Sequence, residues 1–299
     1  MIVNKILHKT FNHFGYKIVA KKPKTDATSE LKDLFGIELP PNIYYYCHKG
    51  WKLLRDLKIA YSATLMINDK NILEISFSKY VFAINTWEEI LVLHEIFVQG
   101  VYNLELKKDF LFIDIGMNVG FTSIYFSSQE YCKNVIAFEP FKNTIDSARY
   151  NMFLNPTFSG AIEIFNIGLG YPKRDLEVEY SNNHKGSVGI NGIAPYVEGI
   201  APRFKVELAI VDVAETLKSF LATPNIKKVM KIDCEGAEYE IINRLAETKL
   251  LNSVDILMIE WPMKGPEEIK GYLSNAGFTT FSFNEFSKTI GMLYAFKPR

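Results

Sequence analysis

The sequence predicts an α/β protein with a Rossmann-like, doubly wound and mostly parallel seven-stranded sheet that ends in an antiparallel hairpin. Two observations support this fold class. From about residue 108, short apolar runs alternate with helical segments, and this alternation is typical of a parallel sheet with right-handed crossovers. After the last expected helix, two apolar runs follow each other directly, at 278–283 and 291–296. These two runs form the expected hairpin.

Five further apolar runs account for the parallel strands. Each of them ends in small, polar or acidic residues, and they lie at 111–115, 134–139, 161–167, 227–233 and 255–261. Helices are expected between them, for example at 142–153 and 236–248. A last helix at 266–277 is closed by Gly277, since glycine commonly ends a helix.

The chain divides at about residue 105. Residues 1–105 are expected to form a mainly helical N-terminal extension or cap, in which Thr86 can cap the clearest helix. Residues 106–299 contain the sheet. Within them, 171–213 are rich in glycine, asparagine and β-branched residues, so we expect a β-rich insertion after the third strand. It would lie near the carboxyl ends of the strands, where open sheets bind ligands, and is placed to act as a lid.

Composition excludes several classes of protein. Lys and Arg number 34, as do Asp and Glu, and this zero net charge argues against a nucleic-acid partner, which would need excess cations. The three cysteines have no CxxC spacing, so neither a disulfide framework nor a zinc site is predicted. No signal peptide or transmembrane stretch is apparent, and we expect a cytoplasmic protein. The lysine-rich first 24 residues are expected to be a solvated helix face, with weak peripheral membrane contact as the alternative.

The sharpest motif, D-x-G-x-x-x-G, follows the first strand of the expected sheet and opens a helix. Its fixed residues are Asp114, Gly116 and Gly120; the glycines let the backbone approach a ligand, and the helix start directs N–H groups at it. A nicotinamide fingerprint would need glycine where Asn118 and Phe121 stand. A carboxylate repels a pyrophosphate and attracts a cation. The motif therefore favours a nucleoside that carries ammonium or sulfonium, and S-adenosyl-L-methionine carries both.

Polar residues also end the next two strands. Glu139 ends the second strand, where a carboxylate can accept hydrogen bonds from two ribose hydroxyls. Asn166 and Ile167 end the third, where an adenine edge would lie, although an ordinary turn explains them equally well. Glu139 and the glycine motif together favour nucleoside binding.

Three carboxylates follow the fourth strand within six residues. Asp233, Glu235 and Glu238 would repel one another there unless they met cations, hydrogen-bond donors or a substrate. The dipole of the following helix explains Glu238. Asp233, at the strand tip, would face the reacting centre.

Three segments together resemble the FkbM-type methyltransferases, which use S-adenosylmethionine and have a class I methyltransferase fold. They are DIGMNVG at 114–120, AFEP at 137–140 with the asparagines 143, 151 and 155 after it, and KIDCEGAE at 231–238. The resemblance runs from about Glu95 to the C-terminus. The family more often has valine where Cys234 stands, and residues 1–85 carry no family signal.

The resemblance implies roles for residues in these segments. The methionine part of the cofactor would be lined by the glycine motif, that is by Asp114, Gly116 and Gly120, with Met117 and Asn118 in the same loop. Glu139 would hold the ribose, and Pro140 or Phe141 would border the adenine.

The expected reaction is O-methylation of a sugar, glycan or small-molecule hydroxyl. Asp233 or Glu235 would remove the proton of that hydroxyl. In an alternative, Asp233, Glu235 and Glu260 hold a divalent cation, because hard cations prefer oxygen ligands, but a metal site is not favoured. His184, in the insertion, is a further candidate base.

Two other classes of function stay open. A non-catalytic methyltransferase-like module would keep the fold in order to bind the cofactor or a partner. A nicotinamide-dependent oxidoreductase would need the glycines that the motif lacks. The sequence selects neither an acceptor nor an oligomeric state.

Overall fold

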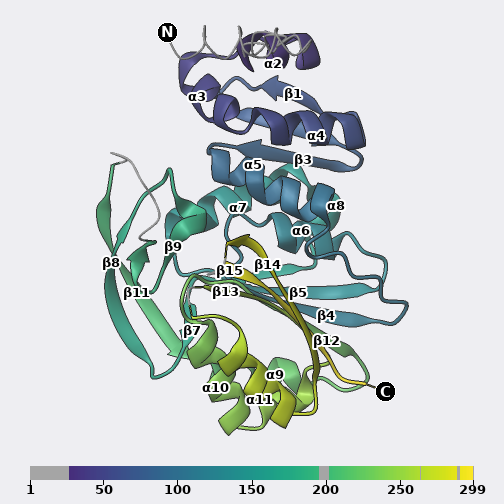
Figure 1. The fold of residues 1–299 in the computed structure, drawn as a ribbon, viewed down its shortest axis with the longest axis vertical. Helices are drawn as coiled ribbons and strands as arrows, with labels where there is room; N and C mark the ends of the chain where they lie inside the picture. The colour runs from purple at the N-terminus through teal and green to yellow at the C-terminus, as the bar shows by residue number, and fades with distance from the viewer. Residues whose placement is uncertain (1–26, 195–201, 263, 288–289, 299) are drawn as a thin grey trace, which may run out of the picture.

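The computed structural model describes residues 27–194, 202–262, 264–287 and 290–298. Its centre is a seven-stranded sheet with the strand order β14-β15-β13-β12-β4-β5-β6 (Figure 1). The strands are β4 (Phe110–Ile115), β5 (Cys132–Phe138), β6 (Ile162–Phe165), β12 (Lys227–Ile232), β13 (Ile256–Pro262), β14 (Thr279–Ser287) and β15 (Ile290–Phe296). The first five pair in parallel, and β15 runs antiparallel to both β13 and β14. The predicted fold class is confirmed.

Helices cover both faces of this sheet (Figure 1). On one face lie α9 (Val213–Leu221), α10 (Glu238–Glu247) and α11 (Glu267–Asn275). On the other lie α5 (Trp87–His94), α6 (Phe121–Ser127), α7 (Lys142–Leu154) and α8 (Pro156–Ser159). The strands are buried on both sides, so the core consists of two large apolar clusters, one between each face and its helices.

The N-terminal extension contains a small sheet that the sequence analysis did not anticipate. After α2 (Ala27–Phe35), α3 (Pro41–Lys49) and α4 (Trp51–Tyr61) come β1 (Thr64–Ile67), β2 (Leu73–Phe77) and β3 (Tyr80–Ile84), which pair antiparallel in chain order. Each of these strands has only four or five residues, too few for a clear periodic signal, even though the β2 sequence LEISF alternates apolar and polar residues. The solvated helix face expected for the lysine-rich start, and weak membrane contact as its alternative, both concern residues 1–26, which lie outside the described residues.

The expected β-rich insertion is present. It starts at β7 (Gly168–Gly170), continues through β8 (Arg174–Tyr180) and ends with β11 (Phe204–Asp212), and these strands form a second sheet in the order β7-β11-β8. A short 3₁₀-helix, η2 (Lys185–Ser187), and a small hairpin of β9 (Val188–Gly189) and β10 (Gly192–Ile193) lie between β8 and β11. Strand β9 lies against the bend after β12, and η2 lies against α5.

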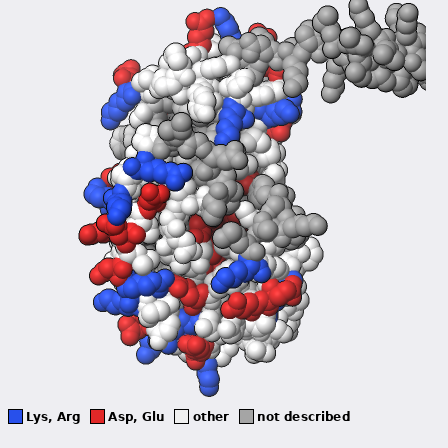
Figure 2. Space-filling view, turned by 60° about the vertical axis from the view of Figure 1, so that its left-hand side comes forward, with Lys and Arg blue, Asp and Glu red and all other residues white. Residues whose placement is uncertain are grey.

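Charges of both signs are mixed over the face of the molecule in Figure 2, and neither sign forms a continuous patch among the described residues there. That no nucleic acid binds stays a prediction. None of the described helices is long and apolar enough to cross a membrane.

Two buried asparagines, Asn151 of α7 and Asn155 directly after this helix, fasten the extension to the large sheet. Asn151 accepts a hydrogen bond from the Ala83 N–H of β3 (2.8 Å) and donates to the carbonyl of Val119 (2.9 Å). Asn155 bonds to both backbone groups of Val81, at 3.1 and 2.6 Å. An asparagine side chain offers a donor and an acceptor together, which is what an unpaired strand edge needs.

We expect Asn151→Ala to lower the free energy of unfolding by about 2–4 kcal/mol, because it leaves two buried backbone groups without partners. Urea denaturation measures the change. Asn143→Ala, on the exposed side of the same helix, is the matched control and should change stability by less than about 0.5 kcal/mol. Equal effects of the two variants would contradict the fastening role of Asn151.

Candidate active site

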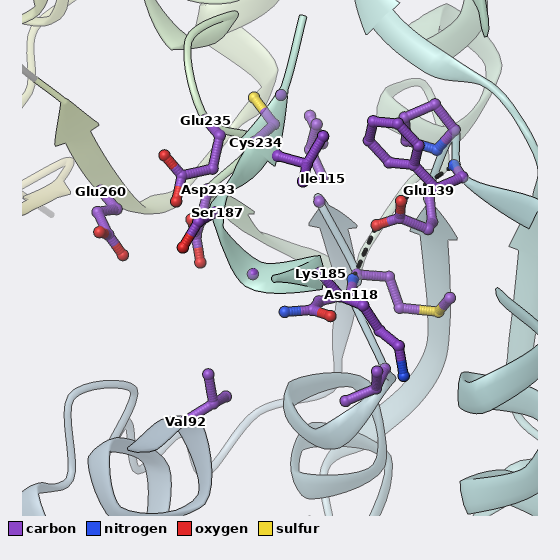
Figure 3. A pocket seen from close by; sticks show the side chains of 18 of the residues that line it. Val92, Ile115, Asn118, Glu139, Lys185, Ser187, Asp233, Cys234, Glu235 and Glu260 are labelled. Carbon is purple, nitrogen blue, oxygen red and sulfur yellow. Dashed lines mark hydrogen bonds between the residues drawn. The ribbon is translucent and has the colours of Figure 1, made fainter. Parts of the chain in front are cut away.

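The carboxyl ends of the parallel strands open into a cavity of about 750 Å³ (Figure 3). One wall consists of the loops that follow β4, β5 and β12, a second of α5, and a third of the inserted segment around η2 and β9. The predicted residues that line it are Gly116, Met117, Asn118, Glu139, Pro140, Ile167, Asp233 and Glu235. Cavities of this size suit small molecules and cofactors.

The glycine loop lies flat against the end of β12. Gly116 has φ +82°, and a β-carbon added to it would lie 1.7 Å from the carbonyl oxygen of Asp233, so only glycine fits. The N–H groups of Gly116 and Met117 both donate to the carbonyl of Phe138 at 3.0 Å. The loop is thereby fixed between β5 and β12.

Asp114 does not line the cavity, contrary to the expectation that it faces the cofactor. Its side chain is fully buried, accepts a hydrogen bond from Ser123 Oγ at 2.7 Å, and has Oδ1 3.3 Å from Lys231 Nζ. The physical reason is that a carboxylate taken out of water needs a paired cation, and the protein itself provides one.

Gly120 and Asn166 also lie outside the cavity wall. Gly120 is the N-cap of α6, with φ +85°, and packs against Ala148 of α7. Asn166 is exposed, and its amide donates to the carbonyls of Glu139 (3.1 Å) and Pro140 (2.8 Å). Both residues hold the loops behind the cavity in place. The sequence could not show whether a residue of these loops contacts a ligand or only supports the loop.

Lys231 is the cation beneath the cavity, and the sequence analysis gave it no role. Its ammonium group donates to the carbonyl of Gly116 (2.6 Å) and lies 3.3 Å from Asp233 Oδ2 as well as from Asp114. Burial lowers the pKa of Lys231, but the two carboxylates outweigh it and hold the pKa above its ordinary value. Lys231 therefore stays charged.

Asp233 has a second partner. Tyr102, from the end of the N-terminal extension, donates its hydroxyl to Asp233 Oδ2 at 3.3 Å. Burial and the charge of Asp233 raise the pKa of Tyr102 well above its ordinary value, so it remains a donor. Oδ2 of Asp233 thus has both an ammonium group and a hydroxyl group as partners.

Glu139 lies at the end of β5 with both oxygens in use (Figure 3). Oε2 accepts from the Asn118 N–H (3.0 Å) and Oε1 from the Phe141 N–H (3.1 Å), so the carboxylate joins two loops of the cavity wall. Burial raises the pKa of Glu139 to about 7, although the two backbone hydrogen bonds lower it.

Three acidic side chains, of Asp233, Glu235 and Glu260, come together on one side of the cavity (Figure 3). Burial and the neighbouring charges of Asp233 and Glu235 raise the pKa of Glu260 well above its ordinary value. In the described part of the chain, no group of three or more acidic, histidine or cysteine side chains is arranged to hold a metal ion. The divalent-cation alternative therefore gains no support from the geometry.

The inserted segment is held over the cavity at two places. At one, β9 rests on the bend after β12: a β-carbon on Gly189 would lie 1.9 Å from the carbonyl oxygen of Glu235. At the other, Lys185 pairs with Glu89 of α5 at 3.0 Å. Glu89 also completes the capping box with Thr86 at the start of α5.

The family comparison agrees with these site segments. The methyltransferase FkbM domain matches residues 114–280, which is more than half of the chain and includes both the glycine loop and the end of β12. The chain belongs to the FkbM methyltransferase family. The resemblance seen in the sequence is thereby confirmed.

Three curated relatives show how far the similarity extends. The chain is 23% identical to methyltransferase sdnD of Sordaria araneosa, over 66% of this chain and 85% of that protein. It is 30% identical to methyltransferase 1 of Beauveria bassiana, over 52% of this chain and 68% of that one. It is also 27% identical to the AMB antimetabolite synthetase AmbE of Pseudomonas aeruginosa, over 60% of this chain but only 8% of AmbE.

Sequence reasoning missed the cavity residues that come from outside the FkbM match. Trp87, Glu88 and Val92 of α5 line the cavity, and Tyr102 does so beside Asp233. The sequence did predict a helix at 86–102. Its apolar pattern alone did not show which side of the helix faces the large sheet, so the cavity residues on it could not be identified.

The pKa of Glu139 makes the stability of this FkbM protein depend on pH. The folded state keeps the proton up to about pH 7, whereas the unfolded chain loses it near 4.5. The contribution of Glu139 to stability is therefore fully present below about pH 4.5 and is lost as the pH rises through about 7. Relative to Glu139→Gln, we expect the wild-type free energy of unfolding to fall by about 3 kcal/mol across this window. Urea denaturation of both proteins at several pH values measures it; a difference that does not change with pH would contradict the burial of an ionisable Glu139.

Proposed function

We propose that the protein transfers the methyl group of S-adenosyl-L-methionine to a hydroxyl group of a small molecule or glycan. Membership of the FkbM methyltransferase family supports the reaction class. The observation that carries the proposal is the shared position of the glycine loop and Glu139 at the carboxyl ends of β4 and β5, where both face one cavity.

The lining of the cavity fits this cofactor. Oδ1 of Asn118 is buried in the loop and has no hydrogen-bond partner among the described residues, so an acceptor is available for a ligand donor. Pro140, Phe141 and Ile167 provide an apolar surface suited to adenine. Asp233 provides negative charge suited to an ammonium or sulfonium group.

Each of these residues has a defined binding role in the proposal. Glu139 would accept hydrogen bonds from the ribose hydroxyls with the lone pairs that the two backbone N–H groups leave free. Gly116, Met117 and Asn118 would contact the methionine part, since they are the residues of the loop that line the cavity.

Bound S-adenosylmethionine supplies a methyl group activated by a sulfonium. The protein then has to hold the acceptor oxygen in line with that group and to remove its proton. Asp233 Oδ2 already has two partners, the Lys231 ammonium group and the Tyr102 hydroxyl, which suits Asp233 to charge balance better than to proton removal. Of the two carboxylates expected as bases at the end of β12, Glu235 is the one that stays a candidate.

Release of S-adenosylhomocysteine tests the activity. The purified protein is supplied with S-adenosylmethionine and a panel of hydroxylated metabolites, saccharides and polyketides. We expect release that depends on an added acceptor. Binding without turnover on any acceptor would favour the non-catalytic module, and binding of NADH in place of the methyl donor would favour the oxidoreductase.

Glu139→Ala should weaken the binding of S-adenosylhomocysteine by about 1–3 kcal/mol, the scale of hydrogen bonds to a charged group. Isothermal titration calorimetry measures this affinity. Glu163→Ala, an exposed glutamate of the neighbouring strand β6, is the control and should leave it unchanged. Unchanged affinity in Glu139→Ala would remove Glu139 from the cofactor site.

A further inference from the structure

A histidine and a glutamate from distant parts of the sequence form a pair in the cavity wall. His184 Nδ1 lies 2.8 Å from Oε1 of Glu88, and both residues line the cavity. Their side chains are largely buried, at 14% and 10% exposure. The other ring nitrogen of His184, Nε2, bonds to no residue that the structure describes. Of the histidines at described positions, His48 and His94 lie outside the cavity wall.

Attachment of the inserted segment to α5 does not require this histidine. Glu88 also accepts hydrogen bonds from the Gly186 N–H and the Ser187 hydroxyl, each at 3.2 Å. The neighbouring pair of Lys185 and Glu89 adds an ion pair. If His184 served only to attach the inserted segment to α5, its hydrogen bond would duplicate these contacts.

The segment that carries His184 lies against the glycine loop. A β-carbon on Gly186 would lie 3.3 Å from Asn118 Nδ2 and 3.6 Å from Glu88 Oε2. The pair is therefore part of the same cavity as the proposed cofactor site. Charged groups near it among the described residues include Lys49, which lies over the Trp87 ring, and the pair of Glu89 and Lys185.

We propose that His184 is the catalytic base of the methyl transfer, in place of the carboxylate expected at the end of β12, and that Glu88 is its positioning residue. The proposal rests on the proposed function. The acceptor O–H bond breaks, its proton goes to Nε2, and the oxygen forms a bond to the methyl carbon as the carbon–sulfur bond breaks with its electron pair on sulfur. Glu88 fixes Nδ1 as the protonated nitrogen and stabilises the imidazolium that forms.

The tautomer of His184 shows whether Glu88 orients the imidazole ring, and it can be measured without a methyl acceptor. In ¹⁵N-histidine NMR spectra at a pH where imidazoles are neutral, with His184→Gln used to assign the signal, we expect the Nδ1–H tautomer. Glu88→Gln should reduce this preference. The Nε2–H tautomer, a persistent imidazolium, or a preference unchanged in Glu88→Gln would overturn the proposal, because Nε2 would then lack a lone pair directed by Glu88.

Turnover tests the proton transfer itself on whichever acceptor the panel identifies. His184→Ala should lower turnover by at least about 10²-fold, with the affinity for S-adenosylhomocysteine changed less than about threefold. Added imidazole should restore part of the rate, since it can replace the missing ring, and 4-methylimidazole should restore a different fraction, following its basicity. His48→Ala is the matched control, because His48 is exposed and lies outside the cavity wall; it should leave turnover unchanged.

The outcomes separate the two proposals. Loss of turnover in Glu235→Gln, with His184→Ala fully active, would return the role of base to Glu235. A His184→Ala variant that loses activity and is not rescued by imidazole would show a structural role. If the wild-type protein methylates no acceptor, the proposed function fails, and the tautomer still decides whether Glu88 orients His184.

Discussion

The buried ammonium group of Lys231 is the interaction on which the rest of the site depends. It joins Asp114 of β4, the Gly116 carbonyl of the glycine loop and Asp233 after β12, and so fixes the ends of two neighbouring strands in one arrangement. Lys231 and Asp114 can be buried together because their opposite charges lie close to each other, and Asp233, which stays partly exposed, lies 3.3 Å from the same ammonium group. The glycine loop can then lie directly on Asp233, since no side chain separates them.

The remaining walls come from parts of the chain outside the parallel strands. Helix α5 belongs to the N-terminal extension, and η2 belongs to the insertion, yet Glu88 and Glu89 join them by several charged hydrogen bonds at mostly buried positions. The cavity is therefore enclosed by contacts between segments about a hundred residues apart. Enzymes of one fold can share the strands that bind the cofactor and differ in the other walls of the cavity. Such walls can determine which acceptor molecule the enzyme binds.

The parallel strands were predictable because each is a short apolar run and helices separate them, a pattern that indicates a parallel sheet with right-handed crossovers. The glycine loop and Glu139 were also predictable, since strand ends meet at one edge. What the sequence did not show was the partner of each charge: Asp114 was expected to face a ligand and instead pairs with Lys231. Nor did it show that Glu88 meets His184, because such contacts depend on how separate layers dock. The roles of Asp233 and Glu235 stay predictions.

The crystal structure of the protein grown with S-adenosylhomocysteine tests the central claim most directly. We expect the ribose against Glu139, the amino acid part along Gly116–Asn118, and the sulfur directed toward the space between Asp233 and the inserted segment. A structure in which the ligand is bound elsewhere, with the loop at 114–120 closed by protein side chains, would contradict the assignment of this cavity to the methyl donor.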